Sequence, residues 1–124
     1  MTDACPFCNP DQKKILLASG ICYAVFDRYP VTRGHILVIP FRHFPDYFES
    51  TPREGEAFDA MVRECRRYLE EEFHPDGYNV GVNVGYAAGQ SVPHMHIHVI
   101  PRYEGDTWHP RGGIRGVIPD KQDY

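Results

Sequence analysis

Every second residue from position 94 to position 98 is a histidine, and the positions between them are apolar. The alternating residues are His94, Met95, His96, Ile97 and His98. Successive side chains of a β-strand point to opposite faces of the sheet, so this spacing predicts a strand over residues 90–101 with all three imidazoles on one face. A half-exposed strand would ordinarily carry serine, threonine or lysine on its polar face. Three imidazoles side by side therefore indicate chemistry rather than solvation.

Two kinds of chemistry fit such a row of histidines. Three imidazoles are one ligand set for catalytic zinc. Alternatively, one imidazole is a nucleophile whose tautomer is fixed by its neighbours. The preceding segment 85–91, Gly-Tyr-Ala-Ala-Gly-Gln-Ser, lets backbone N–H groups approach a phosphate closely, and Gln90 and Ser91 add side-chain donors. A phosphate-binding loop beside the histidine row favours phosphoryl chemistry over metal-assisted hydration.

The remaining segments predict an α+β domain. Strand-forming residues fill 21–27, 34–40 and 78–84. A capping box at 51–54, with proline at the first helical position, begins a helix over about 52–73 whose apolar residues recur at helical spacing. Strands that surround one helix through short connections favour an antiparallel sheet.

Length and composition limit the possible architectures and partners. The chain of 124 residues suits one domain over 1–124, with a core over about 5–103 and a loop-rich tail over 104–124. Its net charge of −4 argues against a polybasic domain that binds nucleic-acid polymers by bulk charge. No apolar run has more than six residues, far fewer than the roughly 20 that cross a bilayer. The first residues lack the basic and apolar character of a signal peptide, so we expect a cytoplasmic protein without membrane partners.

Cysteine usage points to a metal rather than to disulfides. Four cysteines are present, and two of them, Cys5 and Cys8, enclose a two-residue gap. This spacing allows both sulfurs to face one tetrahedral metal ion. Cys22 and Cys65 lie in apolar segments and are expected to be buried as small hydrophobic side chains. Nothing in the sequence indicates export, so a disulfide framework is not expected.

The segment 83–101 resembles the signature of the histidine triad (HIT) superfamily of nucleotide hydrolases and transferases, of the Hint or Fhit type. Asp27, followed by Gly-His-Ile-Leu-Val-Ile-Pro at 34–40, resembles the strand pair of that family's nucleotide pocket. The resemblance covers roughly residues 5–103. It implies a HIT-like fold, an antiparallel β-sheet with one main α-helix, and a homodimer in which the sheet continues across the interface.

The resemblance implies a role for each histidine and for the residues around it. His96 attacks the α-phosphorus and forms a nucleotidyl-histidine intermediate, His98 lies against the phosphate oxygens and the leaving group, and His35 supports them. Asp27 accepts hydrogen bonds from ribose hydroxyls. A neutral imidazole is a competent nucleophile near pH 7, and water then opens the intermediate. The expected phosphate-binding residues, of which Ser91 is also counted as catalytic, are Asn83, Gly89, Gln90 and Ser91.

The resemblance also implies a structural zinc site that the chemistry does not require. Its ligands are Cys5, Cys8, His43 and His94. The implied activity releases a nucleoside monophosphate from a dinucleoside polyphosphate or a nucleoside phosphoramidate, with adenine or guanine as the base. Two alternatives stay open: a zinc-dependent hydrolase with its metal on the three alternating histidines, and a nucleotide-binding or interaction protein with vestigial activity.

Overall fold

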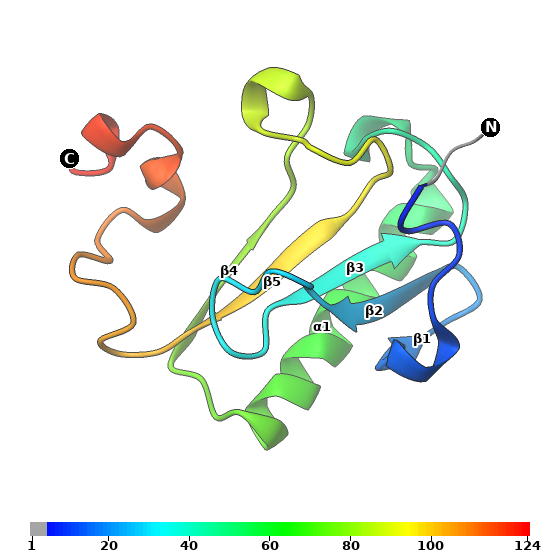
Figure 1. The fold of residues 1–124 in the computed structure, drawn as a ribbon, viewed down its shortest axis with the longest axis horizontal. Helices are drawn as coiled ribbons and strands as arrows, with labels where there is room; N and C mark the ends of the chain where they lie inside the picture. Colours follow the sequence, from blue (N-terminus) through cyan, green and yellow to red (C-terminus); the bar gives the residue numbers. More distant parts are fainter. Residues whose placement is uncertain (1–4) are drawn as a thin grey trace.

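The computed structural model describes residues 5–124; the first four residues, on which the expectation of no signal peptide rests, lie outside the described part. Its centre is a five-stranded sheet in the order β1-β2-β3-β5-β4, and every neighbouring pair is antiparallel. One long helix, α1, covers one face of this sheet (Figure 1). The elements are β1 (Leu17–Ala18), β2 (Cys22–Phe26), β3 (Ile36–Pro40), α1 (Pro52–Glu72), β4 (Gly77–Gly81) and β5 (Ile97–Arg102). The predicted α+β class, an antiparallel sheet with one main helix, is confirmed.

Both faces of the central strands are apolar, but they have different neighbours. Side chains alternate along β2 and β3, so one set faces α1 and the other faces away from it. The helix-side set consists of Cys22, Ala24, Ile36 and Val38. The opposite set consists of Tyr23, Leu37 and Ile39, which pack against Phe7, Ile15 and Val25. The second face is therefore covered by the N-terminal segment, and it forms the base of the candidate site.

Helix α1 begins where the capping box predicts. Thr51 Oγ1 accepts a hydrogen bond from the Glu54 N–H (3.1 Å), and Glu54 Oε1 accepts one from the Thr51 N–H (2.8 Å). A cap of this kind contributes about 1 kcal/mol. The apolar residues that the helix buries at helical spacing are Phe58, Met61, Cys65 and Leu69. Among residues 5–124, no helix has the length and apolar character needed to cross a bilayer.

The strand predicted over 90–101 is wrong in its first half. Strand β5 begins only at Ile97, so two of the three alternating histidines precede it. The reason is that β3 ends at Pro40 and turns into a loop, whose Phe44 carbonyl accepts the hydrogen bond of the Met95 N–H (2.8 Å). The alternation of faces nevertheless persists, because Met95 and Ile97 both belong to the helix-side core.

The strand predicted over 78–84 is also too long. Strand β4 ends at Gly81, which pairs with His98 of β5. Because β5 begins only one residue before His98, β4 soon runs out of a partner and the chain becomes a loop. The strands predicted over 21–27 and 34–40 are confirmed, with their ends shortened by one or two residues.

The tail after Arg102 adds neither a strand nor an α-helix to the described fold (Figure 1, orange to red). It contains two short 3-10 helices, Gly113–Val117 and Pro119–Lys121. Gln122 Nε2 donates to the carbonyls of His109 (2.9 Å) and Arg111 (2.8 Å). These bonds close the tail on itself.

Candidate active site and metal cluster

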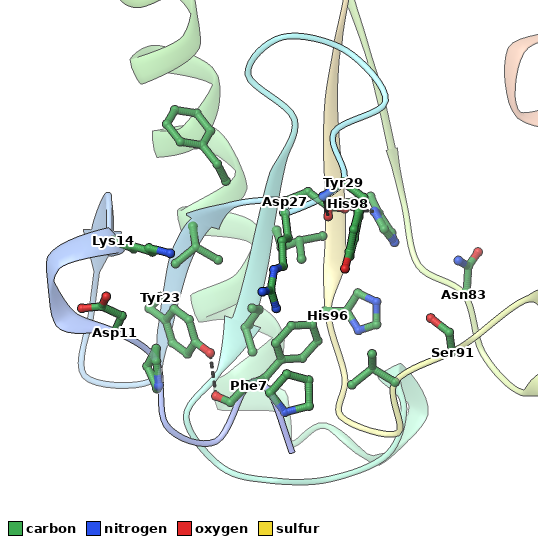
Figure 2. A pocket seen from close by; sticks show the side chains of 18 of the residues that line it. Phe7, Asp11, Lys14, Tyr23, Asp27, Tyr29, Asn83, Ser91, His96 and His98 are labelled. Carbon is green, nitrogen blue, oxygen red and sulfur yellow. Dashed lines mark hydrogen bonds and ion pairs between the residues drawn. The ribbon is translucent and has the colours of Figure 1, made fainter. Parts of the chain in front are cut away.

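A cavity of about 710 Å³ opens on the sheet face opposite α1, a size typical of small-molecule sites. The strand register builds its floor: Val25 of β2 lies opposite Leu37 of β3, and Leu37 lies opposite His98 of β5. Figure 2 shows Asp11, Lys14 and Tyr23 at one end of the cavity. Asn83 and Ser91 are labelled at the other end, and His96 and His98 lie between the two ends (Figure 2).

His96 is held in the tautomer that a nucleophile requires. Its Nδ1 lies 2.8 Å from the carbonyl oxygen of His94, and because a carbonyl only accepts, Nδ1 carries the proton. The free lone pair is then on Nε2, in a side chain that lines the cavity. The rings of Phe7 and His98 pack edge-on to the imidazole, with centroids 5.1 Å and 5.2 Å away. Hydrogen bonding and packing together fix its orientation.

His35 and His98 form a hydrogen-bonded pair whose proton positions follow from the backbone. The N–H of Val31 donates to His35 Nδ1 (3.0 Å), so the proton of a neutral His35 sits on Nε2. His35 Nε2 lies 2.9 Å from His98 Nδ1 and donates to it. His98 therefore carries its own proton on Nε2, as a donor on the cavity wall.

Burial keeps both imidazoles of this pair neutral. It lowers the pKa of His98 to about 4, an effect that His96 and His35 reinforce and Asp27 opposes. Burial likewise lowers the pKa of His35, against the attraction of Asp27. One carboxylate oxygen of Asp27, Oδ2, lies 3.4 Å from His35 Nε2 and 4.0 Å from His98 Nδ1. Its other oxygen accepts a hydrogen bond from the Tyr29 N–H (2.9 Å), which orients the carboxylate.

The backbone before His35 requires glycine. Gly34 has a φ of +86°, and a Cβ at this position would lie 2.9 Å from Leu69 Cδ2. The Asp27 N–H donates a hydrogen bond to the His35 carbonyl (2.8 Å). The backbones of Asp27 and His35 are therefore paired, which keeps their side chains next to each other. The Gly-His pair of the sequence thus lets the backbone pass close to α1 at Gly34 and places the His35 side chain beside Asp27.

Three of the four expected phosphate-binding residues line the cavity. They are Asn83, Gly89 and Ser91. Gln90 is not among the lining residues: its Oε1 accepts from the Gly85 N–H (2.9 Å). Its Nε2 donates to the carbonyls of Pro45 (2.5 Å) and Val92 (3.0 Å). The side-chain amide of Gln90 is thus hydrogen-bonded to the backbone of its own loop and of Pro45, away from the cavity lining.

His94 belongs to a different cluster. Its Nε2–H donates to the Pro40 carbonyl (2.9 Å), which leaves the lone pair on Nδ1. This Nδ1 lies 3.3 Å from Cys5 Sγ and 3.6 Å from Cys8 Sγ. It also lies 2.9 Å from His43 Nδ1, which is itself 3.2 Å from Cys8 Sγ. The structure brings together the four residues that the resemblance implied.

The donor atoms of Cys5, Cys8, His43 and His94, the group called the metal cluster below, fit zinc. Zinc binds sulfur at about 2.3 Å and imidazole nitrogen at about 2.0–2.1 Å, which separates tetrahedral donors by roughly 3.3–3.8 Å. All four ligand atoms lie within 4.8 Å of one another. Burial also lowers the pKa of His94, which keeps its imidazole neutral and able to coordinate.

The proton positions argue against a metal on the other histidines. Among the described residues, a second group with metal-ligand spacing consists of Asp27, His35 and His98. The N–H of Val31 places the His35 proton on Nε2, where a metal would need a lone pair. The three alternating histidines face three different partners, so they do not converge on one ion.

Arg42 fixes the loop that carries His43. Its Nε and Nη2 donate to the two carboxylate oxygens of Glu54 (2.9 Å and 2.8 Å), and its guanidinium lies 4.2 Å from the ring centre of Phe44. The hydrogen bonds from Arg42 are the main reason why the pKa of Glu54 falls to about 2. Because Glu54 also caps α1, one carboxylate holds both the start of the helix and the loop of the metal cluster.

Sequence reasoning missed much of the cavity lining, including five residues with aromatic or cationic side chains. Phe7 and Tyr23 form part of its wall, and Lys14, Arg28 and Tyr29 line it as exposed side chains. A signal existed for Phe7, because it stands between two expected metal ligands and any ordered metal loop fixes it in place. The strand alternation placed Tyr23 opposite the core-facing cysteine and alanine. The three exposed residues carry no signal of their own.

The antiparallel sheet with one main helix, and the alternating histidines beside a cavity, agree with the resemblance to histidine-triad proteins. Residues 10–105 match the family model described as HIT domain, and the chain belongs to this family.

Curated relatives share this domain and are longer. AP-4-A phosphorylase from Mycobacterium tuberculosis is 36% identical over 99 residues, covering 78% of this chain and 51% of the relative. The asymmetrical bis(5'-nucleosyl)-tetraphosphatase of Schizosaccharomyces pombe is 34% identical over 97 residues, 78% of this chain and 53% of that protein. Bis(5'-adenosyl)-triphosphatase from Saccharomyces cerevisiae is 31% identical over 113 residues, 90% of this chain and 52% of its own length. The chain thus spans about half the length of these relatives.

Solved structures confirm the expected HIT-like fold. A zinc-bound histidine triad family protein from Mycobacterium smegmatis has a TM-score of 0.76 and 34% identity, covering 86% of this chain and 80% of that one. A HIT family member from Bacillus subtilis has a TM-score of 0.76 and 33% identity, covering 86% and 82% of the two chains.

Proposed function

We propose that this protein transfers a nucleotidyl group from a dinucleoside polyphosphate first to His96 and then to water. One observation carries the proposal: the Nδ1–H of His96 is bound to the His94 carbonyl, which leaves Nε2 unprotonated in a side chain that lines the cavity. Relatives named as a phosphorylase, a tetraphosphatase and a triphosphatase support dinucleoside polyphosphates as the substrate class. Nucleoside phosphoramidates are the second substrate class.

The chemistry divides into two displacements at phosphorus. In the first, His96 Nε2 attacks the α-phosphorus, an N–P bond forms, and the P–O bond to the departing polyphosphate breaks. The positive charge that this places on the imidazole strengthens its hydrogen bond to the His94 carbonyl. His98 Nε2–H donates to a phosphate oxygen or to the leaving group. In the second displacement, water replaces His96 on phosphorus and a nucleoside monophosphate leaves.

The remaining cavity residues take the roles that their positions allow. Asp27 accepts hydrogen bonds from the ribose hydroxyls, and the apolar floor takes the base, adenine or guanine. Ser91 donates its hydroxyl to the transferred phosphoryl group. The other phosphate contacts come from Asn83 and Gly89, and Gln90 keeps the loop in shape.

The metal cluster is assigned to structural zinc. The donor set supports this assignment, as does the zinc-bound solved relative. The ligands come from the N-terminal segment, the loop after β3 and the segment before β5, so one ion would cross-link three pieces of the chain. Four protein ligands leave zinc no open position for substrate, so it takes no part in the chemistry.

A homodimer joined through β4 completes the proposal. In the described chain β4 pairs with β5 on one side and forms an edge of the sheet. An unpaired edge presents N–H and C=O groups that a second copy can bind. Val80 on this strand is 47% exposed. Sedimentation as a monomer at micromolar concentration would contradict this part of the proposal.

Product analysis tests the activity. Folded, zinc-loaded protein is incubated with diadenosine tetraphosphate, diguanosine tetraphosphate or adenosine phosphoramidate in buffer free of phosphate. We expect one equivalent of nucleoside monophosphate for each molecule cleaved, with the nucleoside triphosphate as the second product of a tetraphosphate. Added inorganic phosphate distinguishes the acceptor, because phosphorolysis of the intermediate yields a nucleoside diphosphate. The proposal would be overturned if none of these compounds were consumed.

A further inference from the structure

The loop of residues 5–8, called the metal loop below, reaches into the cavity through Phe7. This residue stands between Cys5 and Cys8, and its ring lies edge-on to His96 and to His94, with centroids 5.1 Å and 5.8 Å away. Phe7 also lines the cavity. It packs with the apolar cluster of Tyr23, Leu37 and Ile39. A single side chain thus touches the nucleophile, a metal ligand and the floor of the site.

Tyr23, a residue of β2, fixes the position of this loop by a hydrogen bond. Its side chain is 1% exposed on β2, and its Oη donates to the backbone carbonyl of Phe7 at 2.6 Å. Figure 2 shows this hydrogen bond as a dashed line, with the Phe7 ring between Tyr23 and His96. A buried donor and its acceptor lose more when they are separated than their bond contributes on average, so the contact strongly selects one position of the loop.

We propose that Tyr23 is a positioning residue for nucleotidyl transfer, because its hydrogen bond to the Phe7 carbonyl keeps the Phe7 ring packed against His96. This inference rests on the proposed function. The hydrogen bond at Nδ1 anchors one edge of the His96 ring but leaves rotation about that bond to be fixed by packing. A nucleophile displaced on the scale of 1 Å loses on the order of 100-fold in rate.

A tyrosine pair in this chain allows a matched test. Tyr23→Phe removes the hydroxyl and keeps the ring. Tyr103→Phe is the control, because Tyr103 Oη donates to the Arg33 carbonyl at 2.7 Å and does not line the cavity. In full-length, metal-loaded protein we expect Tyr23→Phe to lower kcat/KM by about three- to tenfold, with kcat itself reduced. Tyr103→Phe should leave both constants within about twofold of wild type, whatever its effect on the melting temperature.

A double-mutant cycle tests whether the hydroxyl acts through the ring. Phe7→Ala should lower kcat/KM by about 10- to 100-fold. Adding Tyr23→Phe to Phe7→Ala should then cost less than about twofold, because the contact that the hydroxyl supports is already gone. Phe7→Leu replaces Phe7→Ala in the cycle if the alanine variant does not fold. Additive losses in the cycle, or equal losses in the two tyrosine variants, would overturn the proposal.

A readout without substrate separates this inference from the proposed function. The ring ¹⁵N signals of His96 report its tautomer and its mobility by NMR. We expect one sharp set of signals in wild type and in Tyr103→Phe, and broadened or doubled signals in Tyr23→Phe. Unchanged His96 signals in Tyr23→Phe would overturn the positioning role. A wild-type protein with ordered His96 signals and no turnover would overturn the proposed function instead.

Discussion

The two histidine clusters start from neighbouring residues of one segment and use the same side chain in opposite ways. In the metal cluster, His94 gives its Nε2–H to the Pro40 carbonyl and turns the Nδ1 lone pair towards two thiols. In the second cluster, His35, His96 and His98, which we propose to be catalytic, His96 gives its Nδ1–H to the His94 carbonyl and keeps its lone pair on Nε2. The ring nitrogen that meets a backbone carbonyl decides whether the imidazole has the geometry of a ligand or of a nucleophile.

The two clusters also differ in what holds their side chains together. His35 donates a hydrogen bond to His98, and the Val31 N–H fixes which nitrogen of His35 carries the proton. This hydrogen bond holds the two imidazoles together without a metal ion. The metal cluster instead gathers two cysteine sulfurs and two imidazole nitrogens at the spacing of metal ligands, and a bound cation would hold all four together. Damage to the catalytic cluster should therefore appear in the chemistry, and damage to the metal cluster chiefly in the stability.

Removing the nucleophile should give the largest effect. We expect His96→Ala to lower turnover by at least about 10⁴-fold, as the loss of a covalent nucleophile does in other enzymes. Nucleotide affinity and melting temperature should change little, since the variant removes neither a metal ligand nor the cavity floor. Steady-state rates and equilibrium binding of a nucleoside monophosphate measure the two effects. Wild-type protein quenched at alkaline pH in a single turnover should carry an acid-labile nucleotide adduct that His96→Ala lacks.

His74→Asn is the control for this experiment. His74 is an exposed histidine with a φ of 51°, a conformation that asparagine tolerates. This variant should keep both turnover and adduct. Adduct formation in His96→Ala would assign the nucleophile to a different residue.

Disrupting the metal cluster should give the next largest effect, and a different one. Cys5→Ser combined with Cys8→Ser should remove about one zinc per chain and about 2.7 kcal/mol of stability when free zinc is a hundredfold above its dissociation constant. The melting temperature should fall by several degrees. Protein that stays folded should still form the adduct at saturating nucleotide, but more slowly, because the Phe7 ring that packs against His96 belongs to the released loop. Metal analysis, calorimetry and the alkaline quench measure these outcomes.

Chelation of wild-type protein provides the matching test. If adduct formation stops on chelation while the fold persists, and returns with zinc, the structural role is wrong. Protein purified without chelator that contains no zinc would remove the site altogether.

Local patterns made much of this fold predictable. Helix α1 follows from a capping box and from apolar residues at helical spacing, both of which lie within its own sequence. The start of β5 at Ile97 was not predictable in this way, because it depends on where β3 ends and on the Phe44 carbonyl. Gln90 shows the same limit: its residue type suits a phosphate ligand, but its Nε2 bonds to the carbonyl of Pro45, 45 residues away in the sequence.

The site was predictable where residue types are rare and unpredictable where they are common. Paired cysteines and alternating histidines are unusual, so their convergence was expected from the resemblance. A tyrosine on a strand is ordinary, and only the fold reveals that the Tyr23 hydroxyl meets the carbonyl of Phe7, 16 residues away in the sequence. Residues that position others through the backbone leave little trace in a single sequence.

The smallest expected effect is the response of the catalytic cluster to acid. His98 in the folded protein has a pKa of about 4, set mainly by burial and by its histidine neighbours, with Asp27 opposing. An unfolded histidine takes up its proton near pH 6.5, so between pH 6.5 and 4 the unfolded state binds more protons and stability falls as the pH falls. The cost at pH 5 is about 1–2 kcal/mol and is absent at pH 7.5.

Thermal unfolding of wild type and His98→Asn at pH 7.5 and pH 5 measures this cost. The variant is less stable than wild type at pH 7.5, because it loses the hydrogen bond from His35, but it should lose about 1–2 kcal/mol less on acidification. Metal binding also weakens on acidification, but that effect is common to both proteins and cancels in the difference between them. His74→Asn should follow the wild-type slope. Wild type and His98→Asn could instead lose equal stability between pH 7.5 and pH 5. His98 would then accept a proton as readily in the folded protein as in the unfolded chain, and the conclusion that burial keeps it a neutral donor beside His96 would be wrong.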